Sequence, residues 1–160
     1  MNKIIINAWN SKQSEIKTAI QEMKREEFSY ELLLKNALKI MQTAYEECYE
    51  ECDGPSYERI TRIDNGDYQG TLVFIVGGQC YQPAVDQHWA TSVCYGSCSG
   101  CDIMQGIKEE IPWEDEDEPG YEPKPPKPLP EKVVDELFTL TLHMIQKMCR
   151  LCGDPPEEVC

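Results

Sequence analysis

The sequence predicts an α+β domain: N-terminal helices, a three-stranded antiparallel β-meander and a C-terminal core helix, with a zinc-knuckle-like cysteine site beside the sheet. Apolar residues recur every three or four positions in the first third and again near the end, which is typical of amphipathic helices. Between them, segments rich in β-branched and aromatic residues alternate with glycine-containing turns. A chain of 160 residues has the size of one domain.

Residues 1–53 form the helical part of the prediction. Asn10 or Ser11 is a candidate N-cap for a first helix, because both side chains can accept a hydrogen bond from the first turn. A second periodic stretch follows, so we expect two helices or one helix broken near Phe28. The turn-forming sequence "DGPS" ends this part.

Residues 54–107 change to strand character. The segments "YERITRI", "YQGTLVFIV" and "AVDQHWATSVCY" are separated by the turn signals Asn65-Gly66 and Gly77-Gly78. They predict a β-meander whose third strand leads directly into the sequence "YGSCSGCD".

Two cysteine pairs carry the main chemical signal of the sequence. Cys98 and Cys101 have the two-residue spacing that lets both thiolates bind one tetrahedral metal ion. Cys149 and Cys152 repeat this spacing on the last helix, where residues three apart share a face. Because that helix must cover the sheet, we predict that the pairs meet at a structural Zn²⁺ ion. The reserve ligands are Cys94 and His143.

Two alternatives to this zinc site stay open. Cys149 and Cys152 also lie on an apolar stripe, where cysteine is a common small core residue. Cys98 and Cys101 could instead serve a thiol redox protein, although the preceding meander lacks the βαβ setting of thioredoxin-like sites. No hydrolytic or phosphate-binding motif is present, and the chain has only two histidines. We therefore predict a protein that is not an enzyme.

The charge is strongly negative and is concentrated in one segment. The chain has 29 acidic and 15 basic residues, a net charge of −14, which argues against direct binding to nucleic acid or an anionic membrane. Residues 108–130 form an acidic, proline-rich loop, either a surface for a basic protein partner or a solvated spacer. Its candidate partner-binding residues are Glu109, Glu110, Trp113, Glu114, Asp115, Glu116, Asp117, Glu118 and Tyr121.

Residues 131–153 predict the C-terminal core helix. Two neighbouring apolar stripes give it the wide face of a buried helix, and Gly153 is a natural end signal. The stripes are Val133, Leu137, Leu140, Met144, Met148 and Leu151, and Phe138, Leu142, Ile145, Cys149 and Cys152.

The expected location is the cytoplasm. No apolar run approaches the ~20 residues that span a bilayer, and the first residues lack signal-peptide architecture. Thiols stay reduced in that compartment, so the nine cysteines favour ligands, core residues or redox groups over a disulfide framework.

The segments "GDYQGTLVFIV", "HWATSVCYGSCSGCDIMQGI" and "LFTLTLHMIQKM" resemble a group of small proteins of bacteriophages and prophages of Gram-positive bacteria. A compact, acidic, cysteine-rich phage protein is also similar to anti-CRISPR proteins. This likeness is one of general type and does not involve a shared sequence motif. That likeness implies a protein that inhibits a host-defence nuclease, such as a Cas9-type enzyme, by blocking a nucleic-acid-related surface. A phage regulatory or virion-associated metal-binding protein is the alternative.

Overall fold

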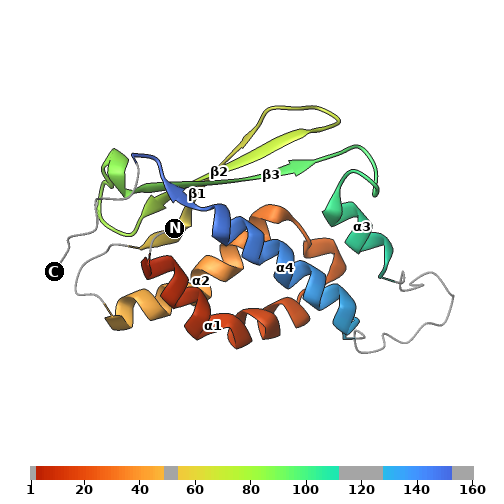
Figure 1. Ribbon diagram of the computed structural model, residues 1–160, viewed down its shortest axis with the longest axis horizontal. Helices are drawn as coiled ribbons and strands as arrows, with labels where there is room; N and C mark the ends of the chain where they lie inside the picture. Colours follow the sequence, from red (N-terminus) through yellow and green to blue (C-terminus); the bar gives the residue numbers. More distant parts are fainter. Residues whose placement is uncertain (1–2, 49–53, 112–127, 153–160) are drawn as a thin grey trace, which may run out of the picture.

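The computed structural model describes residues 3–48, 54–111 and 128–152, which form a sheet layer and a helix layer (Figure 1). In chain order the elements are α1 (Lys3–Gln21), η1 (Arg25–Glu27), α2 (Tyr30–Cys48), β1 (Pro55–Asp64), β2 (Gly70–Gly78), η2 (Val85–Gln87), β3 (His88–Tyr95), α3 (Ile103–Glu109), α4 (Glu131–Lys147) and β4 (Cys149–Arg150). The predicted mixture of helices with an antiparallel sheet is confirmed.

The sheet has four strands in the order β1-β2-β3-β4, rather than the predicted three. All neighbours are antiparallel, and one row of paired residues, Thr61, Ile75, Ala90 and Cys149, crosses all four strands. The Gly77-Gly78 pair, predicted as a turn, is the end of β2.

The fourth strand replaces the predicted end of the C-terminal helix. The helix stops at Lys147, because Met148 takes an extended conformation with its side chain buried. Cys149 and Arg150 then pair with β3, and the N–H of Leu151 donates to the carbonyl oxygen of His88 at 2.9 Å. The predicted end signal, Gly153, lies outside the described residues.

The sheet buries one face only. Alternate residues of β2 and β3 are buried against the helices: Leu72, Phe74, Val76, Trp89 and Val93. Helices α1, α2 and α4 lie together on this side of the sheet (Figure 1). The hydroxyl of the buried Thr91 also donates to the carbonyl oxygen of Met144 at 2.6 Å, which fixes α4 to β3.

The first helix begins at Lys3, well before the predicted N-caps. Ile5 and Trp9 are buried and extend the apolar face by two turns. Inside this helix the Ser11 hydroxyl donates to the carbonyl oxygen of Ala8 at 3.0 Å. The predicted break near Phe28 is real, since η1 separates α1 from α2. Over the described ranges no helix is both long and apolar enough to cross a bilayer.

Candidate functional site

The cysteine-containing segment follows β3, whose last residue, Tyr95, is held by two hydrogen bonds. The hydroxyl of Tyr95 donates to Asp64 Oδ1 and to the carbonyl oxygen of Gly66, both at 2.7 Å. These bonds tie the end of β3 to the turn between β1 and β2. The hydrogen bond from Tyr95 is also the main reason that the pKa of the Asp64 carboxyl is lowered.

Gly96 allows the chain to fold back on itself. A Cβ atom at this position would lie 2.1 Å from the Cβ of Cys101, far closer than carbon atoms can approach. The amide of Gln105 donates to the carbonyl oxygen of Gly96 at 3.3 Å and holds the returning chain in place. Only glycine therefore fits this position without a displacement of the cysteine turn.

Asp102 anchors the turn to the helical layer. Its side chain caps α3 by accepting from the N–H groups of Met104 at 2.9 Å and Gln105 at 3.4 Å. It also accepts a hydrogen bond from the hydroxyl of Tyr30 on α2, at 2.8 Å in a buried contact. Burial, followed by this bond, raises the pKa of Tyr30 well above its ordinary value.

The two thiols of the turn lie together at the surface. Cys98 Sγ and Cys101 Sγ are 3.3 Å apart, and both residues are exposed. The N–H groups of Cys101 and Asp102 donate to the carbonyl oxygen of Cys98, each at 2.9 Å, which closes the turn.

The environment makes the two thiols unequal. The pKa of Cys98 is lowered by the hydrogen bond from the Cys101 thiol and by backbone N–H groups of Gly100 and Cys101. The pKa of Cys101 is raised by the same contact. Cys98 is therefore the sulfur on which negative charge is stabilised.

The second cysteine pair lies at the other end of β3. Cys149 pairs with Ala90 near the start of that strand, whereas Cys98 and Cys101 follow Tyr95 at its end. Five residues of antiparallel strand span about 17 Å, too far for ligands of one ion. Among the described residues, no group of three or more His, Cys, Asp or Glu side chains is placed to hold a metal.

The structure places the two cysteine pairs at opposite ends of β3, and Zn²⁺ binding at Cys98, Cys101, Cys149 and Cys152 stays a prediction. Cys149 and Cys152 are exposed, which argues against the alternative that they pack in the core. Both predictions placed the pair on a helix that in fact ends before it.

The two reserve ligands, Cys94 and His143, lie on other elements than the thiol turn. Cys94 is exposed on β3, with its sulfur 3.8 Å from the hydroxyl of Thr71. His143 is exposed on α4 and lines a groove between α4 and α3.

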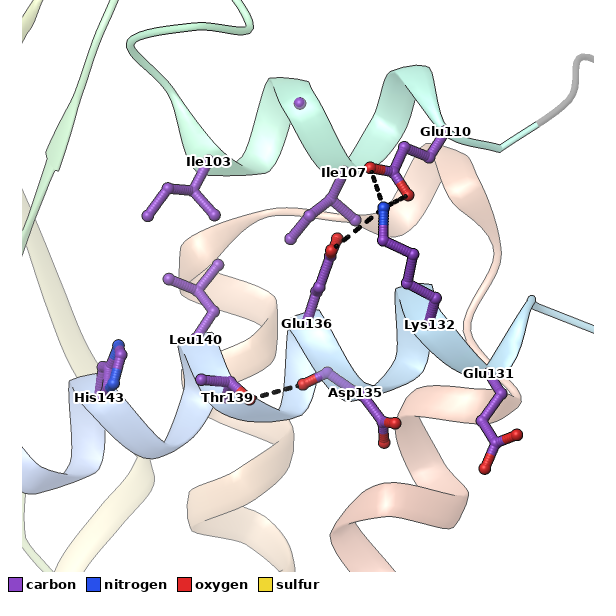
Figure 2. A pocket seen from close by; sticks show the side chains of 11 residues that line it. Ile103, Ile107, Glu110, Glu131, Lys132, Asp135, Glu136, Thr139, Leu140 and His143 are labelled. Atoms are coloured by element: carbon purple, nitrogen blue, oxygen red, sulfur yellow. Dashed lines mark hydrogen bonds and ion pairs between the residues drawn. The ribbon is translucent and has the colours of Figure 1, made fainter.

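This groove has a volume of about 770 Å³ and is the second candidate site. Ile103 and Ile107 point from α3 toward Leu140 on α4, which gives the groove an apolar floor (Figure 2). Ile103 is 60% exposed, so part of this floor is open to solvent. The carboxylates along the rim are Glu110, Glu131, Asp135 and Glu136.

One lysine bridges the two helices across the groove. Lys132 Nζ lies 2.6 Å from both carboxylate oxygens of Glu110, the residue that follows α3. It also lies 3.5 Å from the carboxylate of Glu136 on α4 (Figure 2). The hydrogen bond to Glu110 is the main cause of the raised pKa of Lys132. The lining holds four carboxylates and one lysine, and Lys17 of α1 pairs with the rim carboxylate Asp135 at 2.6 Å. Four carboxylates against these two lysines leave the groove with a net negative charge.

Only the first part of the predicted acidic surface falls within the described residues. Glu109 and Glu110 are exposed at the end of α3. The remaining candidates lie outside the described residues: Trp113, Glu114, Asp115, Glu116, Asp117, Glu118 and Tyr121. The groove itself was missed from the sequence, although the four-residue spacing of Ile103 and Ile107 marks an apolar stripe on α3.

Neither a protein-family model, nor a curated protein, nor a solved structure matches the chain. The dithiol turn and the groove are therefore the two features of the molecule from which a function can be inferred.

Proposed function

We propose that this chain is a protein-binding protein, not an enzyme, whose α3–α4 groove receives a basic and partly apolar segment of another protein. The observation that carries the proposal is the combination of an apolar floor and a carboxylate rim in one groove. An apolar side chain of the partner would bury the exposed part of Ile103, and lysine or arginine residues beside it would face the rim.

The charge around the groove favours the same kind of partner. The segment Lys108–Glu122 has eight acidic residues and one lysine, and it leads from the end of α3 toward the start of α4. Both helices that line the groove are thus joined by the most acidic part of the chain. Such a concentration of charge accelerates the encounter with a basic surface, and the acceleration weakens as salt screens it.

A host-defence nuclease is the first partner to test. The phage and anti-CRISPR resemblance supports this choice, and a nuclease must expose a basic surface to bind phosphates. We propose that the chain inhibits such an enzyme by occupying that surface.

A labelled synthetic helix tests the groove directly. Its sequence would carry leucines on one stripe and lysines beside them, and its binding would be followed by fluorescence anisotropy at low and high salt. Ile103→Ser should weaken binding about tenfold, because burying one isoleucine contributes about 1.5 kcal/mol. Glu131→Lys should weaken it at low salt and matter less at high salt.

Two exposed residues of η2 provide matched controls. Val85→Ser removes a similarly exposed apolar side chain, and Asp86→Lys makes the same charge change away from the groove. Equal effects of the groove variants and these controls would refute the groove as the binding site.

A pulldown with a Cas9-type nuclease tests the partner. We expect retention at low salt, loss at high salt and weaker retention when residues 112–122 are deleted. No retention at low salt would overturn the nuclease as partner, and full retention by the deletion variant would remove the acidic segment from the interface.

A further inference from the structure

We propose that Cys98 and Cys101 form a dithiol–disulfide exchange site, which reacts with an accessible disulfide of a small thiol compound or of another protein. The site needs only the two exposed sulfur atoms, 3.3 Å apart, and the turn that holds them. It is independent of the groove and of the binding function proposed for it.

The two thiols take no part in the contacts that hold the turn in the fold. Tyr95, Gly96 and Asp102 each fix the chain through hydrogen bonds or close approach, and Gln105 supports them. Cys98 and Cys101 are exposed, so core packing does not explain them. The surrounding residues thus form a support that presents two sulfur atoms to solvent.

The turn by itself supplies fewer ligands than a structural zinc ion takes. A structural zinc ion takes four ligands, almost always in tetrahedral geometry. The turn supplies two, and Cys149 lies near the opposite end of β3. Dithiol chemistry is complete with the two sulfur atoms that the turn brings together.

The two sulfur atoms are close enough to form a disulfide after a small movement. A disulfide bond needs the sulfur atoms to be about 2.05 Å apart, so they must approach each other by a little over 1 Å. Rotation of two exposed side chains can provide this movement while the backbone hydrogen bonds from Cys101 and Asp102 to Cys98 remain.

The exchange proceeds in two balanced steps. The Cys98 thiolate attacks one sulfur of the substrate disulfide, which forms a mixed disulfide and releases the other sulfur as a thiolate. Cys101 then loses its proton to solvent and attacks Cys98 Sγ, which forms the Cys98–Cys101 disulfide and releases the second substrate thiolate. The substrate disulfide gains two electrons, and the two cysteines lose them.

The test uses the full chain, reduced and freed of reductant, with oxidised glutathione as the disulfide. Intact mass and peptide mapping would follow the products. We expect the wild-type chain to lose two hydrogen atoms, with the new disulfide mapped to Cys98 and Cys101. Cys101→Ser should instead accumulate a glutathione adduct on Cys98, because the second step is blocked.

Two further variants complete the experiment. Cys98→Ser should give no disulfide in the turn, while Cys149→Ser should react like the wild-type chain. Circular dichroism would verify that each variant is folded, as expected for changes at exposed residues.

The proposal fails if oxidised glutathione leaves Cys98 and Cys101 reduced in the folded wild-type chain, or if it modifies Cys98 and Cys149 to the same extent. It also fails if elemental analysis finds stoichiometric zinc that is lost in Cys98→Ser and that blocks oxidation of the pair.

Discussion

Gly96→Ala is the sharpest test of the way the cysteine turn is built. The added Cβ would lie 2.1 Å from Cys101 Cβ and 2.9 Å from the backbone carbon and oxygen of Cys101. The cysteine must retreat by about 1.3 Å before the contact is ordinary, and it cannot do so alone, because the next residue is the buried Asp102. Overpacking of this kind costs about 2 kcal/mol in free energy of unfolding.

Gly100→Ala is the matched control in the same turn. Its added Cβ would meet only Cys98 Sγ, at 3.9 Å, which is an ordinary contact. We expect the free energy of unfolding of this variant to stay within about 0.5 kcal/mol of the wild-type value.

Urea denaturation under reducing conditions measures both effects, with the buried Trp89 as a fluorescent reporter. For a urea m-value of about 2 kcal/mol/M, the Gly96→Ala midpoint should fall by about 1 M. A Gly96→Ala midpoint equal to that of the wild type would refute the close approach, as would an equal loss in Gly100→Ala.

Three other predictions concern Tyr30, Tyr45 and Lys132. Tyr30→Phe should lower the free energy of unfolding by about 1–2 kcal/mol, measured by urea denaturation, because Asp102 loses a buried donor; an unchanged midpoint would contradict this. Burial raises the pKa values of Tyr30 and Tyr45 in the folded chain, so both stabilise it fully below pH ~10, the pKa of an unfolded tyrosine. Above that pH the unfolded chain releases these protons first, so the Tm of the wild-type chain should fall as pH rises. The fall should be less steep in Tyr30→Phe, and a flat Tm between pH ~10 and ~11.5 would refute the prediction. Lys132→Met should change the free energy of unfolding by less than about 1 kcal/mol, because its ion pairs with Glu110 and Glu136 are exposed; a larger loss would show that this bridge holds α3 on α4.

The strand character of β2 was predictable because the sheet has one buried face. Leu72, Phe74 and Val76 alternate with less buried residues, and this period of two is visible in the sequence. The end of α4 was not predictable in the same way. Apolar residues continue at helical spacing through Leu151, so nothing local reveals that Met148 turns the chain into a strand.

The start of α1 was misjudged for a related reason. Asn10 and Ser11 have side chains typical of helix caps, but they lie inside a helix whose first turns are held by buried Ile5 and Trp9. Tertiary packing outweighed the local capping preference.

The candidate site was only partly predictable. The spacing of Cys98 and Cys101 indicated a paired thiol site, and the two sulfur atoms are indeed adjacent. The position of Cys149 depends on the end of β3 with which the last strand pairs. No local pattern in the sequence shows which end that is. The groove arises between α3 and α4, and no pattern within either helix shows that they are neighbours.

The position of α4 has a consequence for the order in which the fold can be completed on the ribosome. This helix contributes seven buried residues and contacts α1, α2 and β3, yet it is synthesised after all three. Its Phe138 ring meets that of Trp9, from the beginning of the chain, at a centroid distance of 5.2 Å. Until α4 emerges, the inner face of the sheet and the N-terminal helices lack their common cover, so nascent chains stalled before Glu131 should depend on chaperones to stay out of aggregates.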